Sequence, residues 1–159
     1  MASMMKNILE NPSTAVIFDV DGTLTDYAYG ETHAQLELDF SDRERADATN
    51  IYDDSCRRIK TMHRYIQSHG IGMIACLSVE ATHRERWKLE MLWRNYGIPS
   101  DRVFFVRSSE EKVAKAKEIA EMLFDAATDV VMVDDDISTL ARFQQETGIL
   151  TATPMTFVD

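Results

Sequence analysis

The sequence has no hydrophobic run near the length of about 20 residues that a membrane-spanning helix needs. Its first residues, MASMMKNILENP, lack the long apolar core of a secretory signal peptide. Cysteine is scarce, since Cys56 and Cys76 are the only two and neither belongs to a CxxC pair. These absences argue against a membrane span, a zinc knuckle and a redox motif, and they favour a reducing compartment such as the cytoplasm.

Basic residues are also few, because 17 Lys and Arg face 27 Asp and Glu and give a net charge of -10. This charge opposes nonspecific binding to nucleic acid and agrees with metal binding, since clustered carboxylates need a cation. A local basic patch stays open, and the residues expected to form it are Arg84, Arg86, Lys88, Arg94 and Arg107.

Strand-like and helix-like segments alternate along the chain. The strand-like runs are apolar almost throughout, which is typical of parallel strands that helices cover on both faces. They span 14–20, 71–78, 102–106, 129–133 and 148–153. The order predicts a three-layer, doubly wound, Rossmann-like α/β fold with a mainly parallel five-stranded sheet, built as one domain over 1–159. Right-handed crossovers then bring the carboxyl ends of all strands to one edge.

Residues 24–49 interrupt this pattern with a polar, acidic and weakly periodic stretch. They are long enough for a short flap that covers a substrate, or for a solvated loop, and both interpretations stay open. Neither this stretch nor the interval between Ser78 and Lys112 has room for a full second domain.

Two aspartates directly follow the first predicted strand, in the stretch FDVDGTLTD. Side chains two positions apart in an extended chain point the same way, so Asp19 and Asp21 can face one site. Gly22 allows a sharp turn there, which would bring backbone N–H groups near a ligand, and Thr23 follows it.

Further polar residues lie at the same predicted edge. Ser78 ends the second strand, Asp134, Asp135 and Asp136 follow the fourth, and Lys112 lies near the start of a helix. So many carboxylates repel one another unless a hard divalent cation binds, and Mg²⁺ is the expected cofactor. Together with Lys112 and Ser78, the metal would neutralise a bound phosphate.

These residues resemble the four motifs of the haloacid dehalogenase superfamily, a large group of aspartate-nucleophile phosphatases. FDVDGTLTD is similar to the first motif, Ser78 to the second, Lys112 to the third, and VVMVDDD to the fourth. Lys112 lies 22 residues before Asp134, and the resemblance covers residues 14–153.

The resemblance implies a role for each matching residue. Asp19 would be the nucleophile and a metal ligand, and Asp21 the general acid and base, with its backbone carbonyl on the metal. Asp135 would bind the metal directly, with Asp134 in support. Ser78 and Lys112 would bind phosphate, and Gly22 and Thr23 would support the loop.

The sequence also departs from the pattern of the superfamily. Asp134 replaces a common glycine, and Thr139 stands where an additional acid is frequent. Lys115 and Lys117 are alternatives to Lys112 as the phosphate-binding lysine.

The resemblance implies a phosphomonoester hydrolase without a cap domain, and it leaves the substrate open. One similarity is to the 3′-phosphatase domain of polynucleotide kinase, and the other is to tetrameric sugar-acid phosphate phosphatases. The substrate is therefore a polynucleotide 3′-phosphate or a small sugar or nucleotide phosphate, and an oligomer that borrows a cap from a neighbouring subunit is open. The alternative from another class is a non-catalytic regulatory or binding domain with the same fold.

Overall fold

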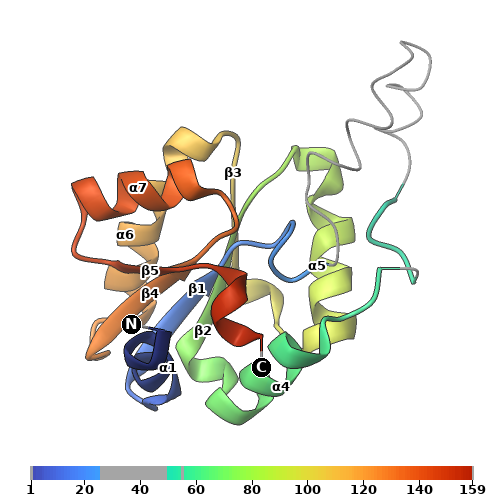
Figure 1. The fold of residues 1–159 in the computed structure, drawn as a ribbon. Coiled ribbons are helices and arrows are strands. Elements are labelled where there is room, and N and C mark those ends of the chain that lie inside the picture. Colours follow the sequence, from blue (N-terminus) through green and yellow to red (C-terminus); the bar gives the residue numbers. More distant parts are fainter. Residues whose placement is uncertain (1, 26–49, 55, 159) are drawn as a thin grey trace.

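Five parallel strands form a single sheet at the centre of the protein (Figure 1). The computed structural model describes residues 2–25, 50–54 and 56–158, and the strand order is β3-β2-β1-β4-β5. All four strand pairs are parallel, which confirms the predicted three-layer α/β fold. The strands are β1 (Thr14–Phe18), β2 (Ile74–Val79), β3 (Val103–Val106), β4 (Asp129–Val133) and β5 (Leu150–Ala152).

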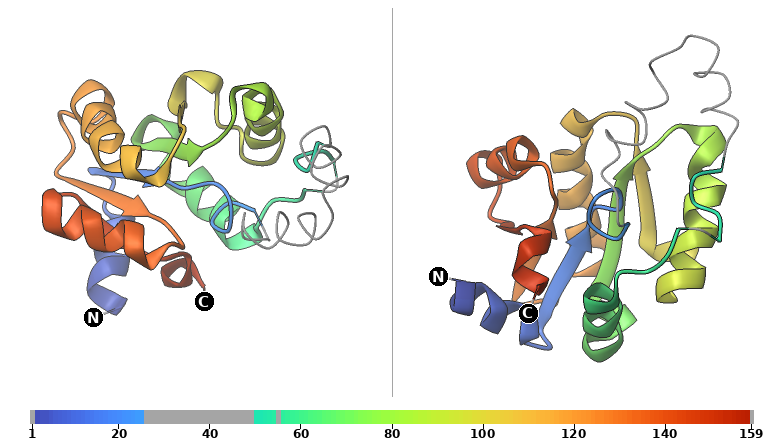
Figure 2. Two further views of the ribbon diagram at one scale, coloured as in Figure 1. Left: turned by 90° about the horizontal axis from the view of Figure 1, so that it is seen from above. Right: turned by 45° about the vertical axis from the view of Figure 1, so that its right-hand side comes forward.

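Helices cover both faces of the sheet, because apolar side chains alternate between the faces along each strand (Figure 2). On β1, Val16 and Phe18 pack in one buried cluster, and Ala15 and Ile17 pack in the other. α4 and α5 contribute to the first cluster, and α6 and α7 to the second. The α-helices after β1 in the described part of the chain are α4 (Lys60–His69), α5 (Thr82–Tyr96), α6 (Lys112–Leu123) and α7 (Ile137–Glu146).

Several strands are shorter than the apolar runs that predicted them. β1 ends at Phe18 instead of residue 20, although the Asp19 N–H still donates to the Val133 carbonyl at 2.8 Å. β2 begins at Ile74 instead of residue 71, because Gly70 turns the chain with a φ of 98° into a 3-10 turn. The 3-10 turns are η1 (Ile71–Met73), η2 (Ser100–Arg102), η3 (Ser109–Glu111) and η4 (Pro154–Phe157).

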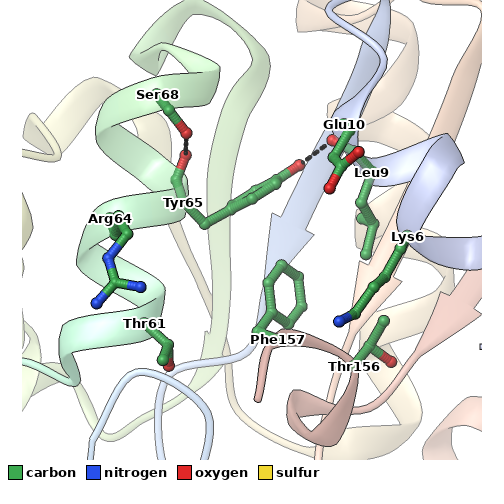
Figure 3. Close-up of a pocket in the computed structure, with 9 residues that line it drawn as sticks. All are labelled: Lys6, Leu9, Glu10, Thr61, Arg64, Tyr65, Ser68, Thr156 and Phe157. Atoms are coloured by element: carbon green, nitrogen blue, oxygen red, sulfur yellow. Dashed lines mark hydrogen bonds between the residues drawn. The ribbon is translucent and has the colours of Figure 1, made fainter. Parts of the chain in front are cut away.

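The helix α1 (Ala2–Glu10) precedes β1 and was not predicted from the sequence. Its Leu9 is buried in the same cluster as Val16. Figure 3 shows Tyr65 of α4 reaching across a hollow of about 230 Å³ to the Leu9 carbonyl, to which its hydroxyl donates at 2.6 Å. Burial and the nearby Glu10 raise the pKa of Tyr65, which keeps this hydroxyl protonated as a donor.

Only the beginning of the predicted flap, residues 24–49, belongs to the described chain. Leu24 and Thr25 are buried beside the loop that follows β1. Residues 26–49 lie outside the described residues, so the choice between a flap and a loop stays a prediction. Among the described helices, none combines the length and the hydropathy that crossing a membrane requires.

Candidate active site

The predicted site residues lie together at the point where the strand order of the sheet reverses. From β1 the chain continues to β2 and β3 on one side, and β4 and β5 lie on the other. Doubly wound sheets bind ligands at such a switch point, beyond the carboxyl ends of the strands. β1 and β4 stay in register up to Phe18 and Val133, so Asp19 and Asp134 leave the sheet as neighbours.

Lys112 joins these two aspartates. Its Nζ lies 2.9 Å from Asp19 Oδ1 and 2.8 Å from Asp134 Oδ2, and all three residues are buried. Lys112 reaches them because η3 ends at Glu111 and α6 begins at Lys112, just past the end of β3. We refer to Lys112, Asp19, Asp134 and Asp135 as the Lys112 cluster.

Asp135 adds a third carboxylate that is exposed to solvent. Carboxylate oxygens of Asp19, Asp134 and Asp135 all lie within 4.8 Å of one another. Three carboxylates exceed the single ammonium group, and hard oxygen donors suit Mg²⁺, so this group fits a divalent cation.

The two outer members of the DDD run have different environments from Asp135. Asp134 uses both oxygens within the protein, since Oδ2 accepts from Lys112 and Oδ1 accepts the Asp136 N–H at 3.0 Å. Asp136 caps α7 by accepting the N–H of Ser138 at 3.0 Å and the hydroxyl of Thr139 at 2.9 Å. Asp136 therefore serves the helix, and Asp135 presents its carboxylate to solvent.

Burial dominates the electrostatics of the Lys112 cluster. It raises the pKa of Asp19 well above the usual range, with Asp134 acting in the same direction and Lys112 opposing it. Burial alone would lower the pKa of Lys112, but Asp19 and Asp134 together raise it, so the ammonium form persists. Partial burial and Asp134 also raise the pKa of Asp135. A cation at the three carboxylates would relieve this cost of gathering negative charge.

The loop after β1 turns at Gly22, whose φ is 77°. The Gly22 N–H donates to Thr25 Oγ1 at 2.9 Å. The N–H groups of Thr23 and Leu24 both donate to the Val20 carbonyl, at 3.1 and 2.8 Å. The buried hydroxyl of Thr23 has no hydrogen-bond partner among the described residues, which fits a ligand or water at this loop.

Asp21 lies in a second buried cluster, around Lys88 of α5. The Lys88 Nζ lies 2.8 Å from Asp21 Oδ2 and 2.9 Å from Glu80 Oε2, and it donates to Ser78 Oγ at 2.8 Å. The Tyr52 hydroxyl donates to Asp21 Oδ1 at 2.6 Å, and the Lys88 Nζ lies 5.0 Å from the centre of the Tyr52 ring. We refer to Lys88, Asp21, Glu80, Ser78 and Tyr52 as the Lys88 cluster.

Lys88 keeps its charge although it is completely buried. Desolvation by burial would lower its pKa, but Asp21 and Glu80 raise the pKa above the usual value. Because the ammonium and the Tyr52 hydroxyl each hold one oxygen of Asp21, the orientation of that carboxylate is fixed.

Sequence reasoning missed three members of this cluster: Tyr52, Glu80 and Lys88. A signal existed for the lysine, since Arg84, Lys88 and Met91 recur at i, i+4 and i+7 on the buried face of α5.

The basic patch that the sequence left open on α5 and around it loses two of its five members. Arg84 and Lys88 are buried, so they cannot contribute to a surface. The Arg94 guanidinium donates to the Tyr52 carbonyl at 2.8 Å, and Arg107 lies 2.6 Å from Glu85. Arg94 and Arg107 therefore have partners within the protein, and the exposed Arg86 pairs with Glu90 at 3.2 Å.

The predicted phosphate-binding residues, Lys112 and Ser78, belong to different clusters. Lys112 lies with Asp19, whereas Lys115 pairs with Glu118 at 3.4 Å outside the cluster, and Lys117 is exposed. Ser78 is buried and accepts from Lys88, and its own hydroxyl has a contact of only 3.5 Å with the Val79 carbonyl. That hydroxyl hydrogen is therefore weakly engaged and could serve a ligand.

Comparisons with known proteins give no assignment. No protein-family model matches the chain, and no curated protein matches it. The functional argument therefore rests on the geometry of the Lys112 and Lys88 clusters and on the motifs of the sequence.

Proposed function

We propose that the protein is a Mg²⁺-dependent phosphomonoester hydrolase that forms an aspartyl-phosphate on Asp19. One observation carries the proposal: the two aspartates of FDVDGTLTD, only two residues apart, bind different buried lysines. Asp19 lies with Lys112 beside the exposed Asp135, which suits a nucleophile next to a site that can hold a cation. Asp21 is held by Lys88 and Tyr52, which suits an oriented proton donor and acceptor.

The donor set of the Lys112 cluster supports Mg²⁺ as the cofactor. Asp19 and Asp135 would bind it through their carboxylates, with the backbone carbonyl of Asp21 as the further ligand that the resemblance implies. Asp134 would support the site, since both of its oxygens already accept hydrogen bonds. When bound, Mg²⁺ offsets the negative charge of the carboxylates and of the substrate phosphate.

The proposed reaction has two displacement steps at phosphorus. In the first, a carboxylate oxygen of Asp19 bonds to phosphorus as the bond to the leaving oxygen breaks, and Asp21 gives that oxygen its proton. In the second, the ionised Asp21 takes a proton from water, whose oxygen bonds to phosphorus as the bond to Asp19 breaks. Lys112 and the Ser78 hydroxyl would stabilise the phosphoryl oxygens in both steps.

Lys88 has the part of a positioning residue in this scheme. It does not need to touch the substrate, because it acts through Asp21, whose Oδ2 it holds at 2.8 Å. Glu80 and Tyr52 are the other neighbours of Lys88. Protein side chains, and not solvent, therefore fix the position of Asp21. Proton transfer depends on geometry first, and a fixed carboxylate satisfies that requirement.

The test is hydrolysis of p-nitrophenyl phosphate with Mg²⁺, with EDTA, and by Asp19→Asn. We expect Mg²⁺-dependent release of phosphate by the wild-type protein and loss of about 10⁴-fold or more in the variant. Asp125→Asn, which changes an exposed carboxylate, is the matched control and should retain activity. Failure of the wild-type protein to hydrolyse any member of a phosphomonoester panel would favour the non-catalytic alternative.

The substrate class stays open between two groups. A 3′-phosphorylated oligonucleotide, sugar phosphates and nucleotide phosphates should be compared under the same conditions, and the highest kcat/KM identifies the class. Size-exclusion chromatography tests whether subunits associate and so could lend one another a cap.

We also propose a reducing, cytoplasmic setting, which the two buried and free thiols of Cys56 and Cys76 support.

A further inference from the structure

Basic side chains converge on one hollow beside α4, outside both lysine clusters. The hollow has a volume of about 580 Å³, and the cationic residues that line it are Arg57, Arg58, Lys60 and Arg64. His63 also lines it, with its Nε2 3.1 Å from a guanidinium nitrogen of Arg58. We refer to this surface as the α4 groove. No acidic side chain lines it among the described residues, although the net charge of the chain is -10. Such a local reversal of charge indicates an anionic ligand.

The position of the groove at the start of α4 strengthens this argument. The N-terminal end of a helix carries a partial positive charge, so acidic residues there stabilise a helix and basic residues do the opposite. α4 has no acidic residue in its first turn, and its N-cap Ile59 provides no capping side chain. Lys60 begins the helix, and Arg57 and Arg58 precede its N-cap Ile59, so positive charge gathers at the end of the helix where it is unfavourable. An anion bound in the groove would neutralise this excess.

The lining of the groove distinguishes between classes of anion. Pockets for small molecules are mostly apolar, with a few polar groups that fix orientation. Every side chain that lines the α4 groove is polar, since Gln67 and Asn95 complete the basic set. Grooves that bind single-stranded nucleic acid through its backbone are lined in this way by positive charge. We propose that the α4 groove binds the phosphodiester backbone of a single-stranded nucleic acid.

One side chain connects this groove to the loop that carries Asp21. The Tyr96 hydroxyl accepts the Ile59 N–H at 2.8 Å and donates to the Leu24 carbonyl at 2.7 Å. Ile59 lies between Arg58 and Lys60, two residues of the groove. A nucleic acid bound in the groove would therefore lie near the loop after β1. Binding does not depend on the proposed phosphatase activity; only the use of that strand as a substrate rests on it.

The binding experiment uses a fluorescein-labelled oligothymidylate of 20 nucleotides and the full chain carrying Asp19→Asn, in EDTA, so that hydrolysis cannot interfere. Fluorescence anisotropy is followed over a salt series for this protein and for two double variants built on it. Arg57→Ala/Lys60→Ala removes two charges from the groove. Arg64 is left in place because it also lines the hollow beside α1 (Figure 3).

The matched control, Arg86→Ala/Lys117→Ala, removes two exposed charges elsewhere. We expect the groove variant to weaken binding about tenfold and the control to leave it unchanged. The slope of log K against log salt should fall by about 1.4 in the groove variant, since each phosphate contact on a single strand contributes about 0.7.

Three results would overturn the proposal: no binding by the parent protein at low salt, equal loss in both double variants, or equal binding of an uncharged methylphosphonate strand. Competition by tripolyphosphate at the molar concentration of the oligonucleotide would also overturn it, in favour of a small polyanion. The groove variant with Asp19 intact should hydrolyse p-nitrophenyl phosphate at the wild-type rate. Hydrolysis and binding are thus measured separately, so a failed phosphatase proposal can be told from a failed groove.

Discussion

In both the Lys112 cluster and the Lys88 cluster, one buried ammonium group lies between two carboxylates. The Lys112 cluster has a third carboxylate, from Asp135, that faces solvent and leaves negative charge in excess. In the Lys88 cluster the other partners are neutral: the Tyr52 hydroxyl contacts Asp21, and Ser78 contacts Lys88. No carboxylate of this cluster is exposed as Asp135 is. The two clusters therefore differ, because the exposed carboxylate of the Lys112 cluster can admit a cation, whereas the contacts within the Lys88 cluster fix the orientation of Asp21.

The comparison also explains why two aspartates in one short motif are not interchangeable. Asp19 leaves β1 in register with β4 and meets Lys112, whereas Asp21 lies past the end of the strand and meets Lys88 of α5. The predictions below test whether the two clusters differ in chemistry, in stability and in their response to metal, beginning with the largest expected effect.

Changing the leaving group should separate the two aspartates. Asp21→Asn removes the proposed proton donor, so we expect kcat/KM for an alkyl phosphate to fall by about 10²–10⁴-fold. The fall for 2,4-dinitrophenyl phosphate should be much smaller, because that leaving group needs no proton. Asp125→Asn is the control and should change neither value. An equal fall for both substrates would remove Asp21 from proton transfer.

The two lysines should respond differently to Mg²⁺. Lys88→Met and Lys112→Met each leave two buried carboxylates without their cation, so each should lower the free energy of unfolding by about 3–5 kcal/mol in EDTA. Mg²⁺ should reduce the deficit of Lys112→Met relative to wild type, because the Lys112 cluster admits the metal. The deficit of Lys88→Met should persist. Urea unfolding with and without Mg²⁺ measures both, and an equal rescue of the two variants would contradict the distinction.

Asp135 should control the effect of Mg²⁺ on stability. The metal should stabilise the wild-type protein by about 2.7 kcal/mol at one hundred times its Kd, which calorimetry detects as a rise in Tm. Asp135→Asn should lose most of that rise, since it removes the exposed ligand without breaking the ion pairs of Lys112. Asp125→Asn should keep it. A full Tm rise in Asp135→Asn would place the metal elsewhere.

The neighbouring Asp136 should have a smaller effect that is independent of metal. Asp136→Ala removes the cap of α7 and should cost about 1 kcal/mol at pH 7. The hydrogen bond from Ser138 helps to lower the pKa of Asp136 below its ordinary value of 3.8. Its contribution is therefore present above 3.8 and is lost as the pH falls through the lower value in the fold. Unfolding at pH 7 and pH 3 checks this, and an altered Mg²⁺ response would show that Asp136 is more than a cap.

The fold was predictable because its strands are continuous apolar segments. The predicted strand 129–133 has the same bounds as β4, whose residues pair on both sides. The α1 helix was not predictable in the same way. It consists of only nine residues next to the chain end, and its place depends on contacts such as that of Leu9 with Tyr65, which lies 56 residues away.

The residues of the candidate site likewise fall into a predictable and an unpredictable group. Asp19, Asp134 and Lys112 follow or precede regular elements at one sheet edge, so topology alone predicts that they lie close together. Lys88 and Tyr52 reach Asp21 from segments 67 and 31 residues away, and no local pattern encodes those contacts. The charged residues of α5 suggested a surface, although Arg84 and Lys88 share the helical periodicity of the buried Met91.

The most direct test of the account is to capture the covalent intermediate. Asp21→Asn should still accept a phosphoryl group from ³²P-labelled acetyl phosphate with Mg²⁺, because this leaving group needs little protonation, but it should release phosphate slowly. After an acid quench and proteolysis, the account predicts label on Asp19, and none in Asp19→Asn/Asp21→Asn. Label on any other residue, or turnover without a labelled protein, would contradict the assignment of Asp19 as the nucleophile.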